Sequence, residues 1–306
     1  MKNWLIVIFS LMFVACSDSS NTESTDTGAD KAEVQLEEKV SVENTEATDV
    51  ATAQAEPENK AVNITTEEIT YEVNGEPFTG FLAFDSNNAD KRPGVLIVHE
   101  WWGHNDYVRS RAIQLAEMGY VALALDMYGA GKVADHPDNA KAFMQAALAN
   151  PEALKARFVS ARELLAKQDV TEAENIAAIG YCFGGAVVLN MARAGADLDG
   201  VASFHGSLAT TSPAAPGSVS AKVLVLNGGA DPLVPMEQVD AFKAEMTAAG
   251  ADYEFVNYPD VLHSFTNPGA TEKGQQFEMP LAYDEQADSD SWQRLENFLA
   301  ELWPKS

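Results

Sequence analysis

The chain has 306 residues, with 46 acidic and 20 basic side chains and a formal net charge of −26. A nucleic-acid interface needs a basic surface, so this charge balance argues against nucleic acid as a partner. Only two cysteines occur, which excludes a disulfide-rich scaffold. The composition changes along the chain and divides it into three parts, residues 1–15, 16–60 and 61–306.

The first part is typical of a secretory signal peptide. Residues 2–15 contain one basic residue followed by an apolar stretch, which is shorter than the roughly 20 residues of a membrane-spanning helix. Phe-Val-Ala-Cys at 13–16 resembles a bacterial lipobox, and this resemblance implies that Cys16 becomes a lipidated N-terminus. The alternative is an ordinary signal peptide in which Cys16 has no such role. We therefore expect an exported lipoprotein on the periplasmic or cell-surface side of a bacterial membrane.

The second part predicts a flexible tether behind the anchor. Residues 17–60 hold 12 acidic residues, 3 Lys and no aromatic residue. Such a segment cannot bury enough apolar surface to offset the entropy of ordering it. A flexible chain of this length spans roughly 35–40 Å. We expect residues 16–60 to be a disordered acidic tether, and residues 61–306 to form one large α/β domain.

Strands and helices are predicted to alternate along the third part. Asn74-Gly75 between two apolar segments predicts a hairpin. Buried or alternating apolar runs predict strands at 95–98, 121–125, 176–179, 200–204, 223–226 and 253–258. Helices are expected at 107–118, within 137–167, and at 186–193, 236–249 and 291–302, with a long loop at 267–290. This alternation predicts a mostly parallel central sheet with helices on both faces.

The strongest chemical signal is Gly-Tyr-Cys-Phe-Gly-Gly at 180–185. It lies between the predicted strand 176–179 and the predicted helix 186–193, which is the setting of a nucleophile elbow. Glycines on both sides permit a tight turn, and the positive end of the helix favours a thiolate. Cys182 is therefore a candidate nucleophile, the alternative being a buried cysteine in a glycine-rich turn.

Two further residues follow in the order expected for a catalytic triad. Asp231 follows the predicted strand 223–226 and His263 follows the predicted strand 253–258. A thiol nucleophile needs a base, and the base needs an acid that orients it. We expect His263 to be the base and Asp231 its partner. The alternatives are an Asp that caps a turn and a surface-loop His.

Residues 66–303 resemble the dienelactone hydrolase family, a thiol branch of the α/β-hydrolases. The matching motifs are Gly-Tyr-Cys-Phe-Gly-Gly at 180–185, Gly-Gly-Ala-Asp at 228–231, His-Ser-Phe at 263–265, His-Glu-Trp-Trp-Gly at 99–103 and Asp-Met-Tyr at 126–128. The resemblance implies an α/β-hydrolase fold and hydrolysis of a small-molecule ester or lactone. It implies an acyl-thioenzyme intermediate and no cofactor.

The same resemblance assigns supporting roles near the nucleophile. It places Glu100 against the Cys182 thiol and Tyr128 beside the site. A carboxylate close to a thiol disfavours the thiolate, and we hypothesise that this protects an exported thiol from oxidation. The alternative is that Glu100 caps a helix or pairs with Arg109 or Arg111.

Backbone N–H groups of Trp101 and Phe183 are expected to form the oxyanion hole. Trp102 and Phe265 are expected in the pocket. The His-Glu motif at 99–100 does not match the zinc motif His-Glu-x-x-His, because His104 comes one residue late. We therefore expect no metal.

The chain departs from the family at two arginines that bind the substrate carboxylate. Those places read Gly-Ala-Gly at 129–131 and Thr-Asn at 266–267, and Lys132 is the nearest substitute for the first arginine. An anionic dienelactone is therefore doubtful as a substrate, and the sequence leaves the natural substrate and oligomeric state open. The alternatives are a general carboxylesterase, a thioester or peptide hydrolase, or a non-catalytic surface binding protein. A thiol redox role lacks a second cysteine in the folded part.

Overall fold

The computed structural model describes residues 61–304. The predicted signal peptide, Cys16 and the tether lie outside the described residues. Within residues 61–304, no helix combines the length and the apolar character needed to cross a membrane.

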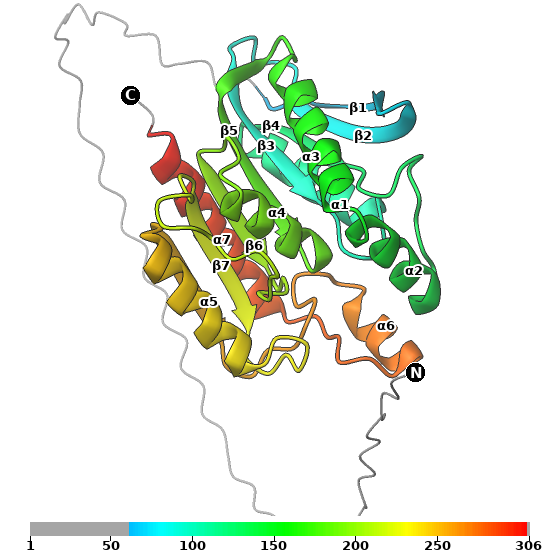
Figure 1. Ribbon diagram of the computed structural model, residues 1–306. Coiled ribbons are helices and arrows are strands. Elements are labelled where there is room, and N and C mark those ends of the chain that lie inside the picture. The colour runs from blue at the N-terminus through cyan, green and yellow to red at the C-terminus, as the bar shows by residue number, and fades with distance from the viewer. Residues whose placement is uncertain (1–60, 305–306) are drawn as a thin grey trace, which may run out of the picture. The chain divides into compact units, whose positions relative to one another are not determined.

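The centre of the described domain is an eight-stranded sheet with the order β1-β2-β4-β3-β5-β6-β7-β8 (Figure 1). The strands are β1 (Ile64–Val73), β2 (Glu76–Asp85), β3 (Arg92–Val98), β4 (Val121–Leu125), β5 (Thr171–Tyr181), β6 (Gly200–Phe204), β7 (Lys222–Gly228) and β8 (Tyr253–Tyr258). The pairs β1–β2 and β2–β4 are antiparallel, and every later pair is parallel. The prediction of a mostly parallel sheet is confirmed.

Helices cover both faces of this sheet, as predicted. The helices of the described residues are α1 (Asp106–Glu117), α2 (Pro137–Leu148), α3 (Pro151–Ala166), α4 (Phe183–Arg193), α5 (Met236–Ala249), α6 (Ala270–Phe277) and α7 (Glu285–Leu302). Helices α1 and α7 pack on one face, and α3, α4 and α5 pack on the other (Figure 1).

The two covered faces explain why the inner strands are apolar without alternation. In β3, Leu96 and Val98 face the core under α3 and α4, whereas Val95 and Ile97 face the core under α1 and α7. All four side chains are fully buried. A strand that is buried on both faces has no position left for a polar side chain.

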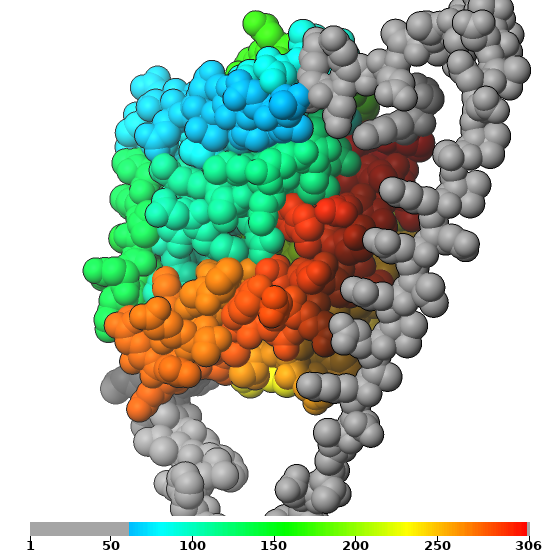
Figure 2. Space-filling model, turned by 180° about the vertical axis from the view of Figure 1, so that it is seen from behind, coloured from blue at the N-terminus to red at the C-terminus, as the bar shows by residue number. Residues whose placement is uncertain are grey.

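Segment 267–290 differs from its prediction as a loop. It contains the whole of α6 and the first turns of α7, and the Asp284 side chain caps α7 by accepting the Ala287 N–H at 2.9 Å. Figure 2 shows this segment in orange, on the opposite side of the domain from the blue hairpin β1–β2. Gly274 weakens the local helix preference of α6, but Ala270 packs into a small apolar cluster with Trp102 and Leu281. Tertiary packing therefore decides the conformation of this segment.

Candidate active site

The predicted site residues gather at the carboxyl ends of the parallel strands. Glu100 follows β3, Cys182 follows β5, Asp231 follows β7 and His263 follows β8. Parallel strands end at one edge of the sheet, and the loops after them form the usual ligand site of an open α/β sheet. The topology thus brings together residues that are far apart in the sequence.

Cys182 sits in a strained turn between β5 and α4. Its backbone has φ 54° and ψ −114°, and the residue is the N-cap of α4. A Cβ atom at Gly180 would lie 2.2 Å from the carbonyl oxygen of Gly184, and one at Gly184 would lie 2.2 Å from the carbonyl oxygen of Val98. Both positions therefore require glycine. The thiol is free and half-buried, and it lies at the positive end of the α4 helix dipole.

His263 and Asp231 form a buried pair. The Nδ1–H of His263 donates to Oδ2 of Asp231 at 2.6 Å, and the N–H of Leu233 donates to the other carboxylate oxygen at 2.8 Å. The second ring nitrogen of His263, Nε2, is buried and has no hydrogen-bond partner in residues 61–304. Burial lowers the pKa of His263, but the negative charges of Cys182 and Asp231 outweigh it and raise that pKa to about 10. The two neighbours thus stabilise the protonated ring of His263.

Glu100 holds the loop that carries His263. Its two carboxylate oxygens accept hydrogen bonds from Ser264 Oγ at 2.8 Å and from Asn267 Nδ2 at 2.6 Å. Burial raises the pKa of Glu100, while these two donors and the charges of His263 and Lys273 oppose the rise. The carboxylate therefore fixes the loop on both sides of its turn.

The alternative arginine pairings of Glu100 do not occur. Arg109 pairs with Glu68 at 2.7 Å, and Arg111 pairs with Asp288 at 2.5 Å. Within the described part of the chain, no hydrogen bond joins Glu100 to Cys182. The Glu100 carboxylate instead contacts Ser264 and Asn267, in the loop that carries His263.

Aromatic side chains surround the nucleophile. The Tyr128 hydroxyl donates to the carbonyl oxygen of Trp101 at 3.1 Å, and its ring centroid lies 5.5 Å from that of Phe183. Burial, then the thiolate charge of Cys182 and the carboxylate of Asp126, raises the pKa of Tyr128. The phenol therefore stays neutral. Among residues 61–304, neither Trp101 nor Phe183 has a hydrogen-bond partner for its backbone N–H.

Trp102 and Phe265 lie behind the site. They are 1% and 0% exposed, so they are covered by other side chains and do not form its surface. Trp102 packs against Trp101 with 4.9 Å between ring centroids. The half-buried Trp101 is the tryptophan that reaches toward solvent.

The segment that lacks the first family arginine is a tight turn. Gly129, Ala130 and Gly131 all have positive φ, and the Asp126 carboxylate accepts the N–H groups of both glycines at 2.9 and 2.8 Å. Lys132 points to the Phe143 ring, with 6.0 Å between Nζ and the centroid. The turn is thus built for backbone hydrogen bonds.

Two chemically relevant residues were missed by sequence reasoning. Lys273, on α6, places Nζ 3.8 Å from the Trp102 ring centroid and lies in the field of Glu100. It was missed because α6 was predicted as a loop. His205 directly follows β6 and is fully buried beside His263, with 5.2 Å between ring centroids. Its place at the carboxyl end of a predicted inner strand is the signal that could have identified it.

The sheet, the nucleophile turn and the order of the site residues define an α/β-hydrolase. Residues 78–303 match the Dienelactone hydrolase family. The chain therefore belongs to this family, and it is a hydrolase that acts on ester or lactone bonds.

Similar proteins support this assignment over the whole described domain. The solved structure m3DLH is 35% identical with a TM-score of 0.73, covering 78% of this chain and 98% of that chain. The dienelactone hydrolase-like promiscuous phosphotriesterase P91, from metagenomic libraries, is 32% identical with the same TM-score and coverage. A Salmonella typhimurium protein named "Putative carboxymethylenebutenolidase" is 26% identical over 76% of this chain and 85% of its own length.

Proposed function

We propose that the chain hydrolyses an ester or lactone through a Cys182–His263–Asp231 triad. The supporting observation is the buried His263 ring, which donates from Nδ1 to Asp231 at 2.6 Å and leaves Nε2 free of other partners in residues 61–304. That nitrogen takes the thiol proton, and the Cys182 thiolate attacks the carbonyl carbon. His263 then protonates the leaving alkoxide, which yields an acyl-thioenzyme. Water that gives its proton to His263 attacks the thioester and releases the acid.

The oxyanion of each tetrahedral intermediate would accept hydrogen bonds from the backbone N–H groups of Trp101 and Phe183. Both donors are unoccupied in the described residues, and Phe183 is the first residue of α4. Donors that are already oriented cost no reorganisation when charge develops, and losing one typically costs about 100-fold in rate. The Tyr128 hydroxyl supports the hole by holding the Trp101 carbonyl.

We expect a neutral ester or lactone as the preferred substrate. The polar groups of the Gly129–Gly131 turn and of Thr266 and Asn267 form hydrogen bonds within the protein. Besides His263, Lys273 is a cation whose charge acts on Glu100, and its ammonium group already lies against the Trp102 ring. A bound carboxylate would therefore lack the two-arginine partner set of the family.

Replacement of the nucleophile tests the mechanism. Cys182→Ala should lower kcat for p-nitrophenyl acetate and simple lactones by at least about 1,000-fold, because the acyl-thioenzyme cannot form. Cys16→Ser removes the other cysteine of the chain and serves as the matched control with unchanged kcat. Mass spectrometry of acid-quenched wild type should show an acyl adduct on the peptide containing residue 182. Full activity of Cys182→Ala would reject the triad.

The panel of substrates also separates the alternatives. A general carboxylesterase would prefer open-chain esters to lactones, and a thioester hydrolase would prefer acyl-thioesters to both. A phosphotriester belongs in the panel because P91, 32% identical to this chain, is named a promiscuous phosphotriesterase. The absence of thiol-dependent turnover on every class would favour the non-catalytic binding protein.

We also propose that residues 1–15 direct export and that Cys16 carries a lipid anchor. The supporting observations are the short apolar run and the lipobox-like residues 13–16. Metabolic labelling with an alkyne fatty acid in a bacterial host should mark the wild type and Cys182→Ala, but not Cys16→Ser. Equal labelling of all three chains would contradict a thiol-linked anchor at position 16.

A further inference from the structure

His205 connects the nucleophile turn to the loop that carries the base. Its Nδ1 accepts the backbone N–H of Cys182 at 3.1 Å, an N–H that also donates to the carbonyl oxygen of Phe204 at 3.0 Å. Its Nε2 lies 2.8 Å from Oγ1 of Thr266, three residues after His263. One buried ring thus touches both segments that must meet during catalysis.

The partners of His205 determine its protonation state. A peptide N–H only donates, so Nδ1 carries no proton, and the single proton of the neutral ring is on Nε2. That proton is donated to Thr266 Oγ1, which lies 2.6 Å from the Tyr107 hydroxyl. Burial, together with the charges of His263 and Arg111, holds the pKa of His205 well below its ordinary value. His205 therefore stays neutral beside His263, which must accept a proton.

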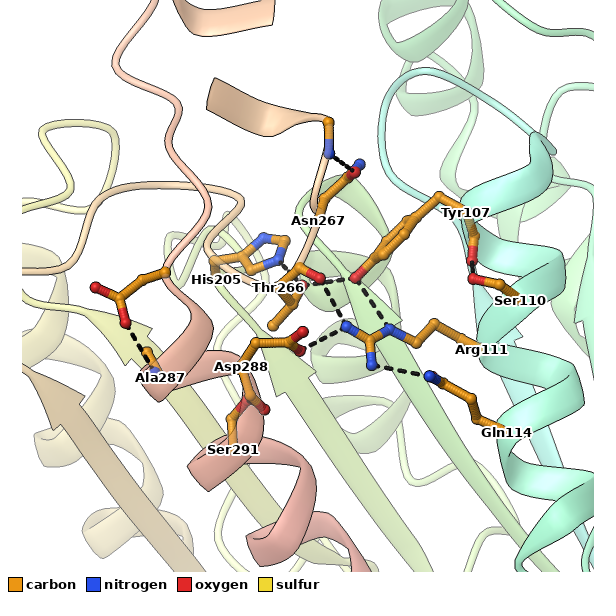
Figure 3. A network of polar contacts seen from close by, with 12 residues as sticks. Tyr107, Ser110, Arg111, Gln114, His205, Thr266, Asn267, Ala287, Asp288 and Ser291 are labelled. Atoms are coloured by element: carbon orange, nitrogen blue, oxygen red, sulfur yellow. Dashed lines mark hydrogen bonds and ion pairs between the residues drawn. The ribbon is translucent and has the colours of Figure 1, made fainter. Parts of the chain in front are cut away.

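The far end of the network is held by a partly buried ion pair. Arg111 donates from Nη2 to the carbonyl oxygen of Thr266 at 2.6 Å and to Oδ1 of Asp288 at 2.5 Å (Figure 3). Figure 3 shows His205, Thr266, Tyr107 and Arg111 following one another from the loop to α1. The Thr266 backbone and hydroxyl are thus both fixed, and the loop presents a rigid acceptor to His205.

We propose that His205 is a positioning residue, which holds the Cys182 turn and the His263 loop at the separation that proton transfer requires. This inference rests on the proposed thiol hydrolase function. The Cys182 turn has a strained φ of 54°, and such strain persists only where neighbours hold it. His205 itself has φ 42°, so the chain turns sharply after β6 to bring the ring beneath the nucleophile.

Two pairs of variants separate positioning from a merely structural role. The amide oxygen of His205→Asn lies near the place of Nδ1 and keeps the acceptor for the Cys182 N–H, and Asn tolerates positive φ. His205→Gln keeps a donor near the place of Nε2 and loses that acceptor. Thr266→Val removes the hydroxyl that accepts from His205 at nearly constant volume, whereas Thr266→Ser keeps it.

The expected readout is a split between kcat and KM. His205→Gln should lower kcat for p-nitrophenyl acetate by about 100-fold and Thr266→Val by about tenfold, the range that follows small misplacements of reacting groups. KM should stay within about twofold in both variants. The kcat of His205→Asn should be at least about tenfold higher than that of His205→Gln. The kcat of Thr266→Ser should exceed that of Thr266→Val by a similar factor.

Alkylation by iodoacetamide gives a second readout that does not depend on the natural reaction. The rate of Cys182 alkylation at pH 7 should fall most in His205→Gln and less in Thr266→Val, as kcat does. The reason is that the His263 ring is no longer correctly placed against the thiol. Missing ester turnover in the wild type would reject the proposed function while the alkylation rates still test His205. Thermal unfolding shows whether each variant is folded. If His205→Gln does not fold, the kcat and alkylation rate of Thr266→Val test the proposal. Wild-type kcat and alkylation in folded Thr266→Val and His205→Gln would overturn the proposal.

Discussion

At the scale of single residues, the backbone of Cys182 is restrained from both sides. Its N–H is shared between the Phe204 carbonyl oxygen and His205 Nδ1, and its carbonyl oxygen accepts the Ala186 N–H at 3.2 Å. A non-glycine residue with φ near 54° needs such support. The direction of the thiol is therefore set by the fold before any substrate arrives.

We propose that Glu100 acts on the same site through its charge and through the loop that carries His263. Glu100→Gln leaves an amide nitrogen where a carboxylate oxygen accepts from Ser264 or Asn267, so one hydrogen bond is lost at a cost of about 1–3 kcal/mol. It also removes a carboxylate from the surroundings of the thiol, which favours the thiolate. We expect a lower free energy of unfolding and iodoacetamide labelling of Cys182 that is at least about threefold faster.

The control for this prediction is Glu68→Gln, which removes an exposed carboxylate paired with Arg109. Glu68→Gln should leave the labelling rate unchanged, and it should change the unfolding free energy by no more than about 0.5 kcal/mol. Urea unfolding and a labelling time course measure the two effects. Equal labelling of wild type and Glu100→Gln would remove the protective role proposed for this carboxylate.

At the scale of elements, α6 illustrates how packing overrules local preference. A Cβ atom at Gly274 would lie 2.2 Å from the carbonyl oxygen of Leu281 and 3.1 Å from that of Met279. The glycine lets the chain return closely against the helix. That close return brings Leu281 and Ala270 into one cluster with Trp102.

Gly274→Ala is therefore expected to destabilise, although Ala is the better helix former by about 1 kcal/mol. Backbone cannot move aside as a flexible side chain does, and the overpacking should cost about 1–3 kcal/mol in unfolding free energy. Gln275→Ala, at an exposed position of the same helix, is the matched control and should be neutral or slightly stabilising. Denaturant unfolding of both variants measures the difference, and a stabilised Gly274→Ala would contradict the packing.

At the scale of the whole domain, buried neutral histidines control the response to acid. Burial lowers the pKa of His99 to about 4 and lowers the pKa values of His104 and His205. Below the unfolded pKa of about 6.5, the unfolded chain binds protons that the folded chain does not bind. Unfolding free energy should therefore fall as the pH drops from about 6.5 to 4, by up to about 1.4 kcal/mol per pH unit for each histidine.

His263 contributes with the opposite sign. Its folded pKa of about 10 lies above the unfolded value, so its contribution is present below about pH 6.5 and is lost as the pH rises toward 10. The two trends together place maximal stability near neutral pH. Urea unfolding at pH 5, 7 and 9 measures both slopes, and His205→Asn should make the acid slope shallower. A flat profile between pH 5 and 7 would contradict neutral buried histidines.

The positions of the inner strands and of the main candidate site residues along the chain follow from local sequence patterns. Apolar runs such as 95–98 and 223–226 predict inner strands because both of their faces are buried, and this periodicity is local. Cys182 stands out for the same reason, since Gly180 and Gly184 mark its turn. Asp231 and His263 are recognisable because each follows such a run in the order of an α/β-hydrolase.

Tertiary structure alone decides the contacts that tie the site together. Ser264 lies 164 residues from Glu100 in the sequence, and Thr266 lies 61 residues from His205, so no local pattern relates these partners. The glycines and acidic residues of segment 267–290 favour a loop locally. The packing of α6 against Trp102, which stabilises the helix, is not visible in the local sequence. By itself, the sequence determined which inner strands form, which thiol is the candidate nucleophile and which family the motifs imply. The close approach of β-strand ends decided how Cys182, His205 and the base loop hold one another, because hydrogen bonds between distant segments exist only after the sheet has formed.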